Sequence, residues 1–114
     1  MVNKWELYYC NLNPTIGSEQ KGKRPVLIIS TDAVNHHLPV STVLPLSSVS
    51  LNDKIYPAEV LLDKTVTGLS KLSVAMVQQI RTVSHNRLTA LLGTITDIET
   101  QKKISDACRS YFDL

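Results

Sequence analysis

Residues 17–30 constrain the fold more than any other part of this chain. They begin as a polar loop with two glycines and change at Arg24-Pro25 into the apolar run Val-Leu-Ile-Ile of residues 26–29. Four consecutive aliphatic residues predict a strand buried on both faces. Proline lacks a backbone N–H, so we expect Pro25 at the first position of that strand. Arg24 is therefore predicted to be a cation held at the end of a rigid strand, beside an adaptable loop, which is a common way to build a site.

Length and composition restrict the class of protein. A chain of 114 residues can form one hydrophobic core but not two, so we expect a single domain over residues 1–114. The hydrophobic fraction of 43% suits a globular protein, and no stretch approaches the ~20 apolar residues of a membrane span. The first residues lack the apolar segment of a secretory signal, and Cys10 and Cys108 form no paired motif, so we expect a cytoplasmic location. The net charge of +2 permits a polyanionic partner without requiring one.

Hydrophobic patterning predicts five or six short strands. They are expected over residues 5–12, 25–30, 39–46, 56–62 and, as one bent strand, 73–77 with 79–83. Pro45 interrupts the third strand, which should therefore lie at a sheet edge or bulge there, presenting Ser47 and Ser48 outward. Residues 31–38 are expected to form a turn or loop.

Two helices are expected near the C-terminus. Ser84 is predicted to cap a short helix over residues 87–92 that stops at Gly93. Thr96 and Glu99 match a capping box for the last helix. Its apolar face is expected to consist of Ile104, Ala107, Cys108 and Tyr111. Short connections favour antiparallel pairing, so the expected fold class is mainly β with α: a curled, barrel-like antiparallel sheet with a short helix and a C-terminal helix.

Polar side chains gather at loops and strand ends, although no phosphate loop, dinucleotide-binding motif or zinc-binding motif is present. The candidates are Ser18, Glu19, Gln20, Arg24, Ser47, Ser48, Gln78, Gln79 and Arg81. Guanidinium and hydroxyl groups bind phosphate, amides read base edges, and a carboxylate can move protons. Each residue also has an ordinary interpretation, as a turn former, a strand residue or a solvated charge in a hairpin loop. The adjacent pair His36-His37 lacks the spacing of metal ligands, so no metal site is expected.

Four segments, in this order, resemble the MazF/PemK toxin family, the mRNA interferases of bacterial type II toxin–antitoxin systems. They are Leu-Asn-Pro-Thr-Ile-Gly-Ser-Glu-Gln (12–20), Lys-Arg-Pro-Val-Leu-Ile-Ile-Ser (23–30), Val-Leu-Pro-Leu-Ser-Ser (43–48) and Gln-Gln-Ile-Arg-Thr-Val (78–83). The resemblance spans nearly the whole chain and implies an SH3-like curled sheet with a C-terminal helix. It also implies a homodimer that cuts single-stranded RNA at short sequences without metal or cofactor, and a small antitoxin that neutralises it.

The resemblance also assigns roles to residues. The family arginine falls on Arg24, and the catalytic threonine or serine that follows the third strand falls on Ser47. The family's Gly-x-Glu loop, which contacts RNA in relatives, falls on Gly17, Ser18 and Glu19. Together with the other polar candidates, the expected RNA-binding residues are Gly17, Ser18, Gln20, Lys21, Lys23, Ser48, Gln78, Gln79 and Arg81. Some relatives carry an arginine and an aspartate in the fifth strand. The corresponding residues here are Met76 and Gln78, so a titratable group of that branch is missing.

Metal-free RNA cleavage can use the 2′-hydroxyl of the substrate and leaves a 2′,3′-cyclic phosphate and a 5′-hydroxyl. The always charged, forked guanidinium of Arg24 suits the phosphate oxygens, and we expect Ser47 to donate a second hydrogen bond. Glu19 is the candidate for the base that takes the 2′ proton. Gln79 and Gln20 are expected to read unstacked bases.

Two other functional classes compete with this one. CcdB-type gyrase poisons share the architecture, but their activity does not need the pair Arg24 and Ser47. A non-catalytic SH3-like module that binds RNA or a peptide is the second alternative. A peptide groove requires exposed aromatic residues, whereas Trp5, Tyr8 and Tyr9 share one early strand and are expected to pack in the core or in a dimer interface.

Overall fold

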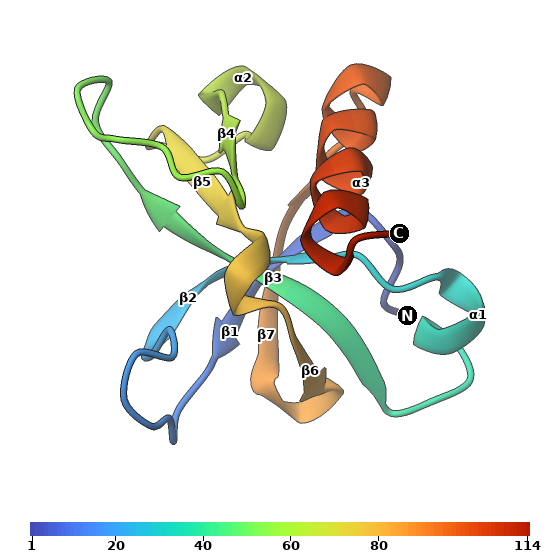
Figure 1. Cartoon of the computed structure of the whole chain (residues 1–114). Coiled ribbons are helices and arrows are strands. Elements are labelled where there is room, and N and C mark those ends of the chain that lie inside the picture. The colour runs from blue at the N-terminus through green and yellow to red at the C-terminus, as the bar shows by residue number, and fades with distance from the viewer.

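Seven strands and three α-helices make up the computed structural model, which describes all of residues 1–114 (Figure 1). In chain order they are β1 (Glu6–Asn11), β2 (Lys23–Ile28), α1 (Asp32–Asn35), β3 (Val40–Ser48), β4 (Glu59–Leu62), α2 (Lys64–Thr67), β5 (Ser73–Met76), β6 (Arg81–Ser84), β7 (Leu88–Thr94) and α3 (Ile98–Phe112). Two 3₁₀ turns, η1 (Val77–Gln79) and η2 (His85–Arg87), connect strands. No helix combines the length and the apolar character that a membrane span requires.

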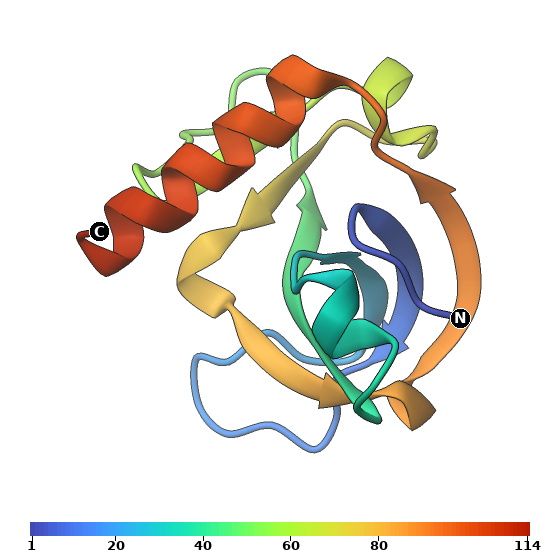
Figure 2. The same cartoon turned by 90° about the vertical axis from the view of Figure 1, so that its right-hand side faces the viewer.

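The strands form one antiparallel sheet in the order β4-β5-β3-β2-β1-β7, and β6 pairs with β3 beside β5. Strand β3 is the long ribbon that crosses the centre of Figure 1. In Figure 2 the strands curl around a common interior, and α3 lies to one side of the curl, where it packs against β4 and η1. The expected curled antiparallel sheet with a C-terminal helix is confirmed. The curl remains open, since β4 and β7 are its two ends.

The last three residues of strand β2 are buried on both faces, as predicted, whereas Ile29, expected in the same buried run, is half-buried and lies beyond the strand. Val26, Leu27 and Ile28 are all 0% exposed. Side chains alternate across a strand, and accordingly Leu27 packs in the core cluster that includes Ile104 of α3, whereas Val26 and Ile28 pack in a second cluster with Cys10. Full burial of each such side chain contributes about 1.5–3 kcal/mol. Burial also raises the pKa of the Cys10 thiol, so this cysteine behaves as a small core residue.

Pro25 and Pro45 occupy positions that differ from the prediction. Strand β2 begins at Lys23, so Pro25 is its third residue and pairs with Tyr9. Pro45 does not lie at an edge, because β3 is central. On one side of β3, β6 covers residues 40–43 and β5 covers residues 46–48, which leaves Leu44 and Pro45 without a register partner there. The missing proline N–H thus falls at the junction between two neighbouring strands, where it interrupts no ladder.

The predicted bent strand over residues 73–83 is two strands, β5 and β6, separated by η1, and both pair with β3. The predicted helix over residues 87–92 is wrong, because residues 88–94 form β7 and pair with the buried strand β1. The hydroxyl of Ser84 does act as a cap, but it accepts from the Asn86 N–H and caps only η2. In this segment the hydrogen bonds that pair β7 with β1 outweigh the local pattern that favours a helix.

The helices differ from the prediction in their boundaries. Residues 31–38, expected to be a turn or loop, contain α1, and the fourth strand begins at Glu59 rather than at residue 56. Helix α3 is capped by Asp97 instead of Thr96: the Asp97 carboxylate accepts from the Thr100 N–H at 3.0 Å. Ile104 is buried as predicted, but Tyr111 is 46% exposed and does not belong to the buried face.

The three early aromatic residues have different environments. Trp5 precedes β1 and packs against the cluster that contains Leu7. Tyr8 packs against the second core cluster. Tyr9 is 39% exposed and therefore belongs to the surface. Packing in the core is confirmed for the first two of these residues only.

Candidate functional site

Two hollows lie beside the C-terminal half of β3. The larger, which we name the strand-end hollow, has a volume of about 440 Å³. Its polar lining consists of Tyr9, Lys23, Arg24, Ser47, Ser48, Ser70, Lys71 and Ser73. The smaller, which we name the loop hollow, has a volume of about 200 Å³ and is lined by Glu19, Gln20, Pro45, Gln78, Gln79, Ile80 and Arg81. Most of the residues predicted to form one site are therefore divided between two adjacent places.

Arg24 is fixed by the sheet and by its own side-chain bonds. It stands in β2 opposite Cys10 of β1. Its Nε donates to the carbonyl oxygen of Lys21 at 3.1 Å, and Nη1 donates to the carbonyl oxygen of Leu46 at 3.3 Å. A guanidinium has five N–H donors, so three remain for a ligand. The position is rigid and the remaining donors are free, which is the arrangement that anion recognition needs.

Ser47 and Ser48 are the last two residues of β3 and pair with Val74 and Ser73 of β5. Ser47 is half-buried, Ser48 is exposed, and neither hydroxyl makes a hydrogen bond within the chain. In the antiparallel pairing of β2 with β3, Val26 lies opposite Pro45. Two residues further along the same register, Arg24 lies opposite Ser47. The structure thus brings together the two residues that the sequence analysis paired as catalytic candidates.

The charged side chains that line the strand-end hollow are all positive. Lys23, Arg24 and Lys71 line it, together with five hydroxyl-bearing residues, and no carboxylate does. Cations and hydroxyl donors without a competing acid favour a phosphate or another oxyanion. Sequence reasoning missed four of these polar residues: Tyr9, Ser70, Lys71 and Ser73. The available signal was the polar segment between Gly68 and the fifth strand, but one sequence does not show that this strand pairs with the end of β3.

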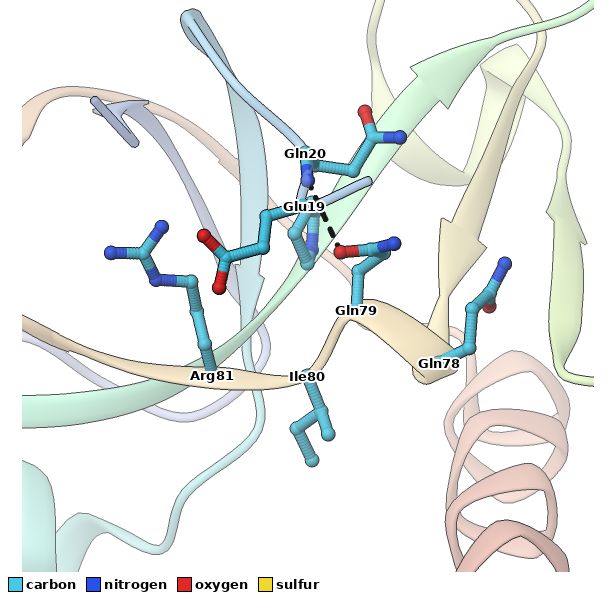
Figure 3. A pocket seen from close by; sticks show the side chains of 7 residues that line it. Glu19, Gln20, Gln78, Gln79, Ile80 and Arg81 are labelled. Carbon is cyan, nitrogen blue, oxygen red and sulfur yellow. Dashed lines mark hydrogen bonds between the residues drawn. The ribbon is translucent and has the colours of Figure 1, made fainter. Parts of the chain in front are cut away.

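In the loop hollow, Gln79 clamps the loop between β1 and β2. Its Oε1 accepts from the Gln20 N–H at 3.1 Å, and its Nε2 donates to the carbonyl oxygen of Ser18 at 3.1 Å. The first of these bonds is drawn in Figure 3. Arg81 Nη1 donates to the carbonyl oxygen of Leu12 at 3.0 Å, at the start of the same loop. Gln79 and Arg81 therefore hold the loop in place.

Glu19 is not brought to Arg24 and Ser47. Its carboxylate accepts from the Ile16 N–H at 2.7 Å, and Figure 3 shows it turned to the side on which Arg81 lies. Gly17 begins this turn with φ of 57°, a left-handed conformation that favours glycine. Gly17, Ser18 and Lys21 line neither hollow. The geometry gives Glu19 a role in shaping the loop.

Gln78 and Gln20 retain free hydrogen-bonding groups. Gln78 Nε2 donates to Glu59 Oε2 at 3.2 Å, whereas its buried Oε1 has no partner. The Gln20 side chain makes no hydrogen bond within the chain, and in Figure 3 it points away from Gln79. The Gln20 amide can donate to or accept from a ligand, and Gln78 Nε2 has a second N–H to donate, whereas the buried Gln78 Oε1 is out of a ligand's reach.

Comparisons with known proteins place the chain among toxins. The model of the PemK-like, MazF-like toxins of type II toxin–antitoxin systems matches residues 3–112. The chain belongs to this family. Endoribonuclease EndoA of Bacillus subtilis is 35% identical over 107 residues, which cover 94% of this chain and 90% of EndoA. Endoribonuclease MazF9 of Mycobacterium tuberculosis is 32% identical, with coverage of 100% and 98%.

Solved structures agree on the fold of this MazF-like chain. MazF (Form-I) from Deinococcus radiodurans superposes with a TM-score of 0.82 at 24% identity, over 99% of this chain and 97% of that one. An endoribonuclease from a mycobacterial species, solved in complex with its cognate antitoxin, gives a TM-score of 0.80 at 23% identity, over 100% and 97%. These two likenesses establish the architecture.

One feature of the MazF-like chain departs from some members of the family. Met76, where the resemblance implies an arginine, is 4% exposed in the buried strand β5. The neighbouring Gln78 carries an amide in place of a carboxylate. Neither residue supplies a titratable group, and neither lines the strand-end hollow. Of the residues expected to be catalytic, this hollow contains Arg24 and Ser47.

Proposed function

We propose that this chain is an endoribonuclease toxin that cuts single-stranded RNA without a metal ion and is neutralised by an antitoxin. The observation that carries the proposal is the juxtaposition of Arg24 and Ser47 in a hollow lined by cations and free of carboxylates. Membership of the MazF-like toxins and the endoribonuclease names of its relatives support it. A cytoplasmic location and a homodimeric state belong to the same proposal, and two unpaired cysteines suit a reducing compartment.

In the proposed reaction the 2′-oxygen of one nucleotide forms a bond to the adjacent phosphorus, and the bond from phosphorus to the 5′-oxygen breaks. The 2′-hydroxyl loses its proton to a base, and the leaving 5′-oxygen takes up a proton. Negative charge increases on the phosphate oxygens in between. Arg24 donates to these oxygens through its free N–H groups, and the Ser47 hydroxyl adds a second donor from the neighbouring strand.

The loop hollow is proposed to select the sequence. Bases of single-stranded RNA are read through hydrogen bonds to their edges. Gln20 has its whole amide and Gln78 has a second Nε2–H available for this contact, whereas both ends of the Gln79 amide already hold the loop. We therefore assign the base contacts to Gln20 and Gln78, and the support of the loop to Gln79.

The test is cleavage in EDTA of a long single-stranded RNA, a DNA of the same sequence and an RNA carrying 2′-deoxy sugars. We expect cuts at one short recurring sequence in the RNA, 5′-hydroxyl ends, and no cleavage of either deoxy substrate. Intact RNA in every reaction would overturn the proposal. Inhibition of DNA supercoiling would then be measured, because a gyrase poison of the same fold was the competing function.

A further inference from the structure

Lys71 is held over the strand-end hollow by the segment between α2 and β5. Helix α2 ends at Gly68, whose φ of 75° is left-handed and turns the chain back toward the sheet. The Ser73 hydroxyl then donates to the carbonyl oxygen of Lys71 at 3.1 Å, and the Val49 N–H donates to the carbonyl oxygen of Leu72 at 2.9 Å. The backbone that carries the Lys71 side chain is therefore fixed to the end of β3 and the start of β5.

The charge of Lys71 is available to a ligand. The side chain is exposed and forms no salt bridge with any acidic residue. It lines the same hollow as Arg24 and Ser47 but comes from a different part of the fold, since Arg24 belongs to β2. An uncompensated ammonium group beside hydroxyl donors attracts an anion.

The strand-end hollow is larger than one phosphate needs. Its 440 Å³ correspond to about fifteen water volumes of about 30 Å³ each. RNA carries one phosphate per nucleotide, so a strand whose reacting phosphate lies at Arg24 and Ser47 has another phosphate one nucleotide away on each side. The hollow has cations of two separate origins to meet them: Lys23 and Arg24 come from β2, and Lys71 comes from the segment before β5.

We propose that Lys71 binds the phosphate next to the one that is cut and thereby fixes the register of the RNA strand. The inference rests on the proposed ribonuclease function and extends it to a residue outside the Arg24–Ser47 pair. A contact to a non-reacting phosphate is made equally in the ground state and in the transition state. Its loss should therefore raise KM and leave kcat nearly unchanged.

The experiment pairs protein variants with neutralised phosphates. Short RNA substrates containing the cleavage sequence carry a single uncharged methylphosphonate at each position around the cut, one position per substrate. The proteins are the wild type, Lys71→Gln, Lys71→Arg and, as a matched control, Lys103→Gln, which removes an exposed lysine of α3 outside both hollows. For each pair kcat/KM is measured at several salt concentrations.

At one flanking position we expect the methylphosphonate to lower wild-type kcat/KM about tenfold, the effect of one charge-assisted hydrogen bond. Lys71→Gln should be insensitive to that same change, Lys71→Arg should retain the sensitivity, and Lys103→Gln should match the wild type. The slope of log kcat/KM against log salt should become shallower by about 0.7 in Lys71→Gln.

Two results would overturn the inference. If Lys71→Gln loses as much activity as the wild type at every methylphosphonate position, the two changes are independent and Lys71 touches none of these phosphates. That result leaves the ribonuclease function intact, because the wild type still cuts the all-phosphate substrate. If the wild type cuts no RNA, the proposed function fails, and the inference fails with it.

Discussion

Nη1 of Arg24 lies 3.3 Å from the carbonyl oxygen of Leu46, the residue that precedes Ser47 in β3. The bond joins the first residues of β2 to the last residues of β3, beyond the point at which their ladder of paired residues ends at Val26 and Pro45. The guanidinium and the hydroxyl are thus positioned by the sheet before any ligand arrives. Donors that need no reorganisation stabilise developing charge most effectively.

Replacement of Arg24 should therefore abolish most of the activity. Arg24→Ala is expected to lower kcat for RNA cleavage by about 10²–10³, the usual effect of losing one preorganised donor. Arg24→Lys keeps the charge but not the planar fork, and we expect at least a tenfold loss. Single-turnover cleavage in EDTA measures both. Thermal melting of each variant serves as the folding control, and wild-type kcat in a folded Arg24→Ala would refute the assignment.

RNA cleavage should require a hydroxyl at position 47, whether serine or threonine supplies it. Ser47→Ala is expected to reduce kcat about tenfold to a hundredfold because it removes one donor to the phosphate, whereas Ser47→Thr retains the hydroxyl and should keep activity within a few fold. Ser50→Ala, an exposed serine just beyond β3 that does not line the hollow, is the matched control. Equal activities of Ser47→Ala and Ser50→Ala would remove Ser47 from the mechanism.

Local pattern was sufficient to predict what depends on neighbours in sequence. The buried run 26–28 and the apolar positions Ile104 and Cys108 follow from periodicity alone, and β2 and α3 lie close to where they were expected. Pairing between strands distant in sequence could not be predicted from local pattern. Residues 88–94 form a strand because they pair with β1, and their own sequence does not show that partner.

The candidate site shows the same division. The resemblance to a family supplied Arg24 and Ser47, which the structure brings together, whereas chemical reasoning added Glu19 as the base, and the structure keeps Glu19 apart from them. Lys71 was absent from the prediction because it reaches the hollow only through the pairing of β5 with β3. The order of the strands in the sheet decides which polar residues line the same hollow. That order cannot be derived from a single sequence.

Asp97 should make the stability of the fold depend on pH. Hydrogen bonds from the side chain and the backbone N–H of Thr100 hold the pKa of this carboxyl below 3.8. A lowered folded-state pKa gives stability that is complete above the unfolded value and lost as pH falls through the folded one. Asp97→Ala should therefore lower Tm at pH 7, with a smaller difference from the wild type as pH falls below 3.8. Asp97→Asn, which keeps a cap without a charge, should show less pH dependence. A difference between Asp97→Ala and wild type that stays constant with pH would contradict the ionised cap.

Glu19 offers a direct test of its two possible roles. As a base it would give the pH profile of kcat an acidic limb, and Glu19→Gln would remove that limb together with most of the activity. Its carboxylate instead accepts from the Ile16 N–H and lines the hollow that lacks Arg24. We expect Glu19→Gln, whose amide oxygen can still accept that bond, to retain kcat within about tenfold and an unchanged profile shape. Loss of the limb in the measured profile would restore Glu19 as the base.

Gln79 should control RNA binding through the loop that it holds. Gln79→Leu removes the bonds to the Gln20 N–H and to the Ser18 carbonyl oxygen, and nothing else in the chain replaces them. We expect residues 13–22 to exchange amide hydrogens faster and to be cut sooner by trypsin at Lys21, while Tm changes little because the loop lies outside both core clusters.

The same variant should bind RNA more weakly. KM for RNA should rise several fold with a smaller change in kcat, since Arg24 is still bound to Leu46 on the neighbouring strand. Gln101→Leu, which removes the bond from Gln101 Nε2 to the carbonyl oxygen of Ile95 at 2.8 Å, is the matched control for a glutamine hydrogen bond lost away from the loop. If amide hydrogens of the loop exchange as slowly in Gln79→Leu as in the wild type, the two hydrogen bonds of Gln79 do not order the loop.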